Sequence, residues 1–224
     1  MKKEVTQLLV ASKETGWVLE PEAKQIFSSV GLEVPRFIWT TRLEEALRFA
    51  EGLGYPVVAK VVSPQILHKS DRNGVVVGIR GERELTETFE RFRQVERFAG
   101  ILVEERVSGL ELIIGSKTDC QFGPVILLGI GGTGVEIYRD VSLRMAPLTG
   151  KDIDSMIRSL KAHQLLEGYR GVRPVNRTKL VELLAVVSGL ALELEESVES
   201  MDLNPVICSS TRCVIADARI ILKG

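Results

Sequence analysis

The sequence predicts an α+β protein of two α/β lobes with a boundary near residue 100. Before that point, segments with helical and strand periodicity alternate along the chain. After it, three strand-like segments follow one another with few residues between them, which is typical of an antiparallel sheet. We expect residues 1–100, with an extension over 1–18, to form an N-terminal lobe and residues 101–224 a C-terminal lobe. Ligand sites favour the cleft between two such lobes.

Helices and turns in the N-terminal lobe follow local signals. Pro21 and an apolar face ending at Gly31 predict a helix over 20–31. Thr41 with Glu44 has the form of a capping box and predicts a second helix that ends near residues 52–54. A third helix is expected over about 82–98, with strands at 36–40, 55–62 and 74–79.

The C-terminal lobe is expected to be richer in strands. The β-rich segments predict strands at 101–107, 110–116 and 123–130, followed by a glycine-rich turn. Helices are expected at 151–160 and 178–194. Two closing strands, at 198–203 and 213–217, are expected to flank a turn at Asn204-Pro205.

Composition excludes several classes of protein. The formal net charge of -1 gives no general attraction to nucleic acid or to anionic membranes. The three cysteines, Cys120, Cys208 and Cys213, lack metal-site spacing and predict buried thiols in a reducing cytoplasm. We expect neither a signal peptide nor a transmembrane segment, because no apolar run is long enough.

Two basic residues in the N-terminal lobe are candidates for phosphate chemistry. Lys60 lies in an otherwise apolar strand, so it must reach solvent or meet an anion such as a phosphate. Taken alone, a lysine on an edge strand explains it equally well. His68 lies in a polar loop near Asp71, and imidazole can accept a phosphoryl group near neutral pH. Taken alone, an ordinary surface histidine explains His68.

An acidic bend and a glycine-rich segment are candidates for nucleotide binding. The backbone around Glu105 to Val107 can offer an amide and a carbonyl to adenine, and Glu111 can accept hydrogen bonds from a ribose. Taken alone, this is an acidic hairpin. Four glycines lie within residues 129–134, but no helix pattern follows, which argues against a Rossmann fingerprint. A loop that closes over phosphates is the better interpretation.

Oxygen-bearing side chains near the C-terminus suggest a magnesium site. Asp202 and Asn204 alternate along a strand, so both can point to one face, and Asp217 on the next strand can join them. Oxygen ligands of this kind suit Mg²⁺ held together with substrate phosphates. Taken separately, each of these residues is also a common turn former.

Together these motifs resemble the ATP-grasp fold, most closely the β subunits of ADP-forming acetyl-CoA synthetases, relatives of the succinyl-CoA synthetase β chain. The resemblance spans residues 15–222 and rests on three segments in the same order. They are residues 60–71, the loop 131–136 running on to 144–148, and residues 202–206. One departure is Asn73, where the family usually has glycine; asparagine tolerates left-handed backbone angles better than most residues.

The resemblance implies a role for each matching residue. Lys60 corresponds to the lysine that contacts nucleotide phosphates, and His68 to the histidine that relays phosphate on a mobile loop. Glu136 is expected to orient that imidazole or the incoming phosphate. The remaining assignments are an adenine hinge at Glu104, Glu105, Arg106 and Val107, a ribose contact at Glu111, a phosphate loop at Gly131 and Gly132, and Mg²⁺ ligands at Asn204 and Asp217, with Asp202 as an outer or bridging member.

The resemblance also implies partners and a reaction. A CoA-binding α subunit, in an α2β2 complex, would convert acyl-CoA and phosphate into acyl phosphate. His68 would then carry the phosphoryl group to Mg·ADP, with Mg²⁺ and ADP/ATP as cofactor and nucleotide. Two alternatives stay open. In the first, the chain is a direct carboxylate-activating ATP-grasp ligase and His68 is incidental. In the second, it is a non-catalytic nucleotide-sensing subunit.

Overall fold

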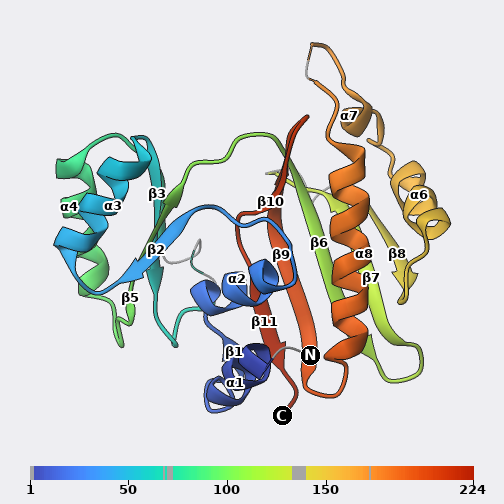
Figure 1. Ribbon diagram of the computed structural model, residues 1–224, viewed down its shortest axis with the longest axis horizontal. Coiled ribbons are helices and arrows are strands. Elements are labelled where there is room, and N and C mark those ends of the chain that lie inside the picture. Colours follow the sequence, from blue (N-terminus) through green and yellow to red (C-terminus); the bar gives the residue numbers. More distant parts are fainter. Residues whose placement is uncertain (1–2, 68, 70–72, 133–139, 172) are drawn as a thin grey trace. The chain divides into compact units, whose positions relative to one another are not determined.

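The computed structural model describes residues 3–67, 69, 73–132, 140–171 and 173–224, and the chain divides into two compact units (Figure 1). Residues 35–107 form one unit, called here the inserted unit. Residues 1–34 and 108–224 together form the other, called the major unit. Among the described residues, no helix combines the length and the apolar character that crossing a membrane requires.

This division differs from the expected boundary at residue 100, because the first 34 residues belong to the major unit. Strand β1 (Trp17–Val18) pairs with β11 (Arg219–Leu222) near the other end of the chain. Helix α2 (Glu20–Ser29) buries Phe27 completely in the core of the major unit. The helical periodicity of this segment indicates a buried face, but it does not say which sheet covers that face.

The inserted unit is an antiparallel sheet with two helices on one face. Its strands lie in the order β2-β5-β3-β4. Alternate residues of the two central strands pack toward the helices, among them Ala59 and Val61 of β3 and Ile101 and Val103 of β5. The elements are β2 (Phe37–Thr40), α3 (Leu43–Leu53), β3 (Val57–Val62), β4 (Val75–Ile79), α4 (Glu82–Arg93) and β5 (Gly100–Glu105).

The major unit is a seven-stranded antiparallel sheet packed against a long helix. The strand order is β1-β11-β9-β6-β7-β8, and β10 pairs with β9. Helix α8 lies along β6, β7 and β9 (Figure 1). Its further elements are α1 (Lys3–Ala11), β6 (Leu110–Asp119), β7 (Gly123–Ile130), β8 (Val141–Met145), α6 (Gly150–Ser159), α7 (Gln164–Glu167), α8 (Arg177–Glu193), β9 (Val198–Cys208) and β10 (Cys213–Ile215).

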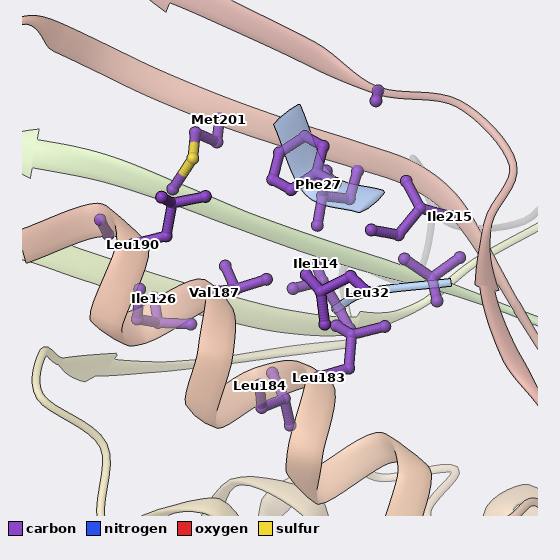
Figure 2. Packing of buried hydrophobic residues seen from close by; sticks show 14 of the residues in the cluster. Phe27, Leu32, Ile114, Ile126, Leu183, Leu184, Val187, Leu190, Met201 and Ile215 are labelled. Carbon is purple, nitrogen blue, oxygen red and sulfur yellow. The ribbon is translucent and has the colours of Figure 1, made fainter. Parts of the chain in front are cut away.

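The core of the major unit lies between α8 and the sheet. Figure 2 shows Leu183, Val187 and Leu190 of α8 beside Ile114 and Ile126 of the strands. Burial alternates along β6, where Leu112 and Ile114 are buried and their neighbours Glu111 and Ile113 are not. Because successive strand residues point to opposite faces, Glu111 and Ile113 lie on the face away from α8.

Strand β9 corrects one of the expectations from the sequence. It continues through Asn204 and Pro205, where we expected a turn. Leu112 pairs with Val206 and Ile114 with Leu203, so β9 carries one extra residue at this point, as in a β-bulge. A proline can be accommodated at such an irregularity, whereas in a regular central strand it would remove a ladder hydrogen bond.

Three smaller expectations were also wrong. The capping box expected from Thr41 and Glu44 does not form, because Arg42 occupies the N-cap position of α3 without a side-chain cap. A different pair, Thr40 and Glu45, makes a side-chain hydrogen bond there. Helix α4 ends at Arg93, five residues before the expected end at 98. Cys120 is exposed in the turn between β6 and β7, whereas the other two cysteines are buried as expected.

Candidate nucleotide and phosphoryl-transfer site

Lys60 and Glu104 form a buried ion pair in the inserted unit. Lys60 Nζ lies 2.9 Å from Glu104 Oε1, and the two side chains are 6% and 3% exposed. Strand β3 lies between β4 and β5, so the interpretation of Lys60 as an edge-strand lysine is wrong. Because Ala59 and Val61 pack toward the helices, Lys60 and Glu104 lie on the opposite face of the sheet. That face therefore holds a buried cation, which could interact with a phosphate.

The segment expected to hold adenine, Glu104 to Val107, ends at the boundary of the inserted unit. The Glu105 carboxylate accepts a hydrogen bond from Arg36 Nε at 2.8 Å, and the Glu105 N–H donates to the carbonyl oxygen of Arg36 at 3.0 Å. Arg106 is exposed and Val107 is partly exposed. Both carboxylates of the segment therefore have partners within the inserted unit.

The loop between β3 and β4 contains His68, which lies outside the described residues. The described ends of this loop are held by hydrogen bonds. Ser63 Oγ donates to the carbonyl oxygen of Glu96 at 2.9 Å, and the Gly74 N–H donates to the carbonyl oxygen of Lys69 at 2.8 Å. The Val61 N–H of β3 also donates to the carbonyl oxygen of Gly74 at 2.9 Å, so the segment that contains the histidine is tied to β3 at one end and to Glu96, beyond the end of α4, at the other.

Two residues at the end of this loop need special backbone properties. Asn73 has a φ of 51°, the left-handed conformation that we expected asparagine to accept where the family has glycine. A Cβ on Gly74 would lie 2.7 Å from Val61 Cγ1, so only glycine fits the turn back into β4.

The start of the glycine-rich loop lies against Glu111 in the major unit. The Gly131 N–H donates to the carbonyl oxygen of Glu111 at 2.7 Å. A Cβ on Gly131 would lie 2.8 Å from that carbonyl group, so this close approach requires glycine. A Cβ on Gly132 would lie 3.9 Å from Glu111 Oε2. The structure thus brings these three site residues together, with Glu111 exposed on the face away from α8.

Asp140 anchors the far end of the glycine-rich segment and was not among the predicted site residues. Its carboxylate accepts hydrogen bonds from the N–H groups of Lys161 and Ala162, both at 2.8 Å. Its carbonyl oxygen accepts the N–H of Ile130 at 3.2 Å. The only sequence signal was an aspartate directly before the strand at 141–145. The intervening Glu136 lies outside the described residues.

Asn204 and Asp217 lie on segments that are tied together. The N–H groups of Ala216 and Asp217 donate to the carbonyl oxygen of Pro205 at 3.0 and 3.3 Å, which fixes Asp217 beside β9. Asn204 is exposed and Asp217 is partly exposed. Asn204 therefore lies at the bulge of β9 and Asp217 lies beside it, and both residues are accessible to solvent.

Asp202 has a different environment from these two residues. It pairs in register with Arg219 of β11, and Arg219 Nη1 lies 4.0 Å from Asp202 Oδ2. Met201 and Leu203 on either side are buried, so Asp202 points away from the core, as Asn204 does. Asp202 and Asn204 therefore point to the same face of the sheet, as expected, but only Asp202 has Arg219 beside it.

The oxygen atoms of Asn204 and Asp217 suit a cation that also takes ligands from a bound nucleotide. No cluster of three or more His, Cys, Asp and Glu residues arranged for a metal occurs in the part of the chain that the structure describes. Mg²⁺ is often bound by only one or two protein oxygens and takes its other ligands from phosphates and water. Asn204 and Asp217 therefore fit Mg²⁺ bound with phosphates better than a metal held by protein alone.

Comparison with known proteins shows the family of the chain. A family model described as "ATP-grasp domain" matches residues 9–222. The β subunit of acetate–CoA ligase [ADP-forming] I from Pyrococcus furiosus is 41% identical over 220 residues, which cover 95% of this chain and 94% of that subunit. The single-chain acetate–CoA ligase [ADP-forming] I of Archaeoglobus fulgidus is also 41% identical, over 92% of this chain but only 31% of that protein.

A solved structure extends the likeness to three dimensions. It is that of Ca. Korarchaeum cryptofilum dinucleotide forming acetyl-coenzyme A synthetase 1 in complex with coenzyme A and Mg-AMPPCP, with its phosphohistidine segment pointing towards the nucleotide binding site. Its TM-score to this chain is 0.85 at 42% sequence identity, with 98% of this chain and 100% of that chain covered. The chain therefore has the ATP-grasp fold and belongs to the family of ADP-forming acetate–CoA ligase β subunits.

Proposed function

We propose that this chain is the nucleotide-binding β subunit of an ADP-forming acyl-CoA synthetase and that it passes a phosphoryl group from His68 to Mg·ADP. In this step the N–P bond at the phosphohistidine breaks, and an O–P bond to the terminal phosphate of ADP forms. The products are ATP and the free imidazole. Across the whole complex, an acyl-CoA, phosphate and ADP become the acid, CoA and ATP.

The observation that carries the proposal is the likeness to a solved relative in which a phosphohistidine segment points towards bound Mg-AMPPCP. The likeness extends over 98% of this chain. In this sequence His68 comes eight residues after Lys60, in the loop that follows strand β3. The described residues on either side of this histidine are held by hydrogen bonds.

Lys60 is proposed to bind the nucleotide phosphates. A buried ammonium group needs a counter-ion, and without nucleotide Glu104 supplies it at 2.9 Å. The ammonium has three donors, so a phosphate oxygen can join while Glu104 keeps the side chain oriented. A charge held in position before the reaction stabilises the transferring group without reorganisation at the moment of transfer.

The major unit is proposed to hold the sugar, the phosphates and the metal. Glu111 would accept hydrogen bonds from the ribose, with the backbone of Gly131 and Gly132 facing phosphate. Asn204 and Asp217 would hold Mg²⁺. When bound, Mg²⁺ neutralises charge on the phosphate oxygens. The proposal is completed by Asp202 in an outer position, Glu136 as the orienting group for His68, and an adenine hinge over residues 104–107.

A partner subunit is the second part of the proposal. The matching protein of Pyrococcus furiosus is named as a β subunit, whereas the Archaeoglobus fulgidus relative carries the matching region as 31% of one longer chain. The match to 94% of a protein named as a β subunit supports a separate CoA-binding α subunit acting with the present chain. We propose an α2β2 assembly in the cytoplasm, where acyl-CoA, phosphate and nucleotides are available.

Phosphoryl labelling tests the relay directly. The chain is copurified with its native partner and incubated with γ-labelled ATP and Mg²⁺. We expect an acid-labile, base-stable label that is absent in a His68→Ala variant. His163→Ala is the matched control, because His163 is the only other histidine and its ring binds the carbonyl oxygen of Leu160 at 2.9 Å. Label that persists in His68→Ala contradicts the relay.

Turnover separates the proposal from its two alternatives. With acetyl-CoA, phosphate and ADP, the complex should make ATP, and His68→Ala should lower the rate by at least about a hundredfold, in the range known for key catalytic groups. ATP-dependent activation of a carboxylate without the partner, unchanged in His68→Ala, would identify a direct ligase. Nucleotide binding without turnover in the complete complex would identify a sensing subunit.

A further inference from the structure

Cys208 and Cys213 lie directly opposite each other in the hairpin formed by β9 and β10. The N–H of Ser209 donates to the carbonyl oxygen of Arg212 at 2.8 Å, so the adjacent pair is hydrogen-bonded. Since the two kinds of pair alternate in an antiparallel ladder, Cys208 and Cys213 form a non-hydrogen-bonded pair. Cα atoms in such pairs are about 4.5 Å apart, which lies within the range that a disulfide spans, about 4.4 to 6.8 Å.

We propose that Cys208 and Cys213 are a redox-active dithiol that closes to a cross-strand disulfide when it meets a low-molecular-weight disulfide. The thiolate of Cys213 attacks one sulfur of the oxidant and releases the other as a thiol. The thiol of Cys208 then loses its proton and attacks the mixed disulfide, which releases the second oxidant thiol. Two protein thiols are oxidised, and one oxidant disulfide is reduced to two thiols.

The surroundings of Cys213 suit the first of these steps. Cys213 is only 3% exposed, but unlike Cys208 it lines a cavity of about 620 Å³, together with Glu33, Lys179 and Leu183. Lys179 lines the same cavity, and its pKa is raised mainly by its hydrogen bond to Glu182.

The surroundings of Cys208 suit the second step. It is 1% exposed and lies on β9 between β10 and β6, where Leu110 is its partner on the other side. Its thiol is hydrogen-bonded to Cys213 and desolvated by burial, and both effects raise its pKa. Cys208 is therefore a poor first nucleophile, yet it lies beside the sulfur that it must reach after Cys213 has reacted.

The short hairpin also explains how a buried pair can react. Strand β10 has three residues, and the turn at residues 210–211 is exposed. The reaction of the buried pair therefore requires local opening of this hairpin end, not unfolding of the whole sheet. The same ladder continues to the hydrogen bonds that Ala216 and Asp217 make to Pro205, so the disulfide would fix the register of this ladder.

The test uses the whole chain with Cys120→Ser, because Cys120 is exposed and would form adducts of its own. Oxidised glutathione is the probe, and intact mass, thiol alkylation and non-reducing peptide mapping are the readouts. We expect the loss of two hydrogens, protection of both thiols and a Cys208–Cys213 cross-linked peptide. Thiols that stay intact in the folded protein but oxidise in urea would overturn the proposal.

Single variants test the order of attack in the same background. Cys208→Ser should accumulate a glutathione adduct on Cys213, whereas Cys213→Ser should form an adduct on Cys208 at least about tenfold more slowly, because only one of the two sulfurs lines the cavity. Equal rates would overturn the assignment of roles. If a serine variant fails to fold, the cross-linked peptide of the Cys120→Ser chain still decides whether the pair closes.

Discussion

Lys60 Nζ lies 2.9 Å from Glu104 Oε1, although the two residues are not directly opposite in the sheet of the inserted unit. Lys60 is opposite Leu102, and Glu104 is opposite Val58, so the ion pair runs diagonally across β3 and β5. Both side chains are nearly inaccessible to water. Removing either partner therefore leaves a buried charge, and any experiment on Lys60 has to separate folding from nucleotide binding.

Variants of Lys60 and Glu104 can separate the effect on folding from the effect on nucleotide binding. Lys60→Met should lower the free energy of unfolding by about 3–5 kcal/mol, because it leaves the buried carboxylate unpaired. It should also abolish measurable binding of Mg·ADP. Chemical denaturation and isothermal titration calorimetry measure the two effects.

The matched control is the double variant Lys60→Met with Glu104→Leu. Replacing both charges by apolar groups should restore most of the stability, because no unpaired charge is left. Nucleotide binding should stay lost, since the cation is still absent. A stable double variant that binds Mg·ADP as the original chain does would contradict the role of Lys60.

The second prediction concerns the oxygen ligands in the major unit. Asp217→Asn and Asn204→Ala should each raise the Mg²⁺ concentration needed for half-maximal phosphoryl transfer by at least about tenfold, because each removes or weakens one of two protein ligands. Asp202→Asn should have a smaller effect, since Asp202 is near Arg219 at 4.0 Å. Equal Mg²⁺ requirements in all three variants would contradict the assignment. Thermal melting checks that each variant is folded.

The third prediction compares two glycines with different surroundings. Gly131→Ala would place a Cβ 2.8 Å from the backbone of Glu111, so the start of the loop must move. We expect a loss of stability of about 1–3 kcal/mol, typical of overpacking, and weaker nucleotide binding. Gly189 lies inside the C-terminal half of α8, and a Cβ there would meet nothing within 4 Å.

The matched control, Gly189→Ala, should therefore stabilise the protein by about 0.8–1 kcal/mol through higher helix propensity. Its nucleotide affinity should be unchanged. Calorimetry with Mg·ADP and chemical denaturation of both variants test the pair of predictions. Unchanged affinity in Gly131→Ala would remove the loop start from the proposed site.

Much of the fold could be predicted from local patterns. Helix α2 and helix α8 lie within one to two residues of the expected bounds, because each has a periodic apolar face. What could not be predicted depends on pairing between distant segments. The two-residue strand β1 has no periodicity of its own and exists because it pairs with β11. That pairing moves the first 34 residues into the major unit.

The candidate site shows the same limit. Motifs located Lys60 and Glu111, but the partners of these residues depend on strand register. Glu104 pairs with Lys60 only because β3 and β5 are neighbours, and Gly131 meets Glu111 only because β6 and β7 form a hairpin. Asn204-Pro205 signals an interruption of regular structure, and whether that is a turn or a bulge is decided by the neighbouring strand β6.

The last prediction is a pH dependence from the cap of α6. The Thr149 hydroxyl and the Thr149 N–H both donate to the Asp152 carboxylate, and the Asp152 N–H donates back to Thr149 Oγ1. These bonds, the side-chain bond first, hold the pKa of Asp152 below its usual value. A carboxyl group with a lowered pKa in the folded state stabilises the protein above its unfolded pKa of about 3.9, and this stabilisation is lost as the pH falls through the folded value.

Asp152→Asn should therefore lower the melting temperature at neutral pH and have progressively less effect as the pH falls below about 3.9. Thr149→Ala should cost about 0.5–2 kcal/mol at neutral pH and, since it removes the main donor, should flatten the pH dependence attributed to Asp152. Melting curves of both variants and the double variant over the acid range measure this coupling. Additive effects in the double variant at neutral pH would show that the two side chains act independently, contrary to the shared hydrogen bonds of the cap.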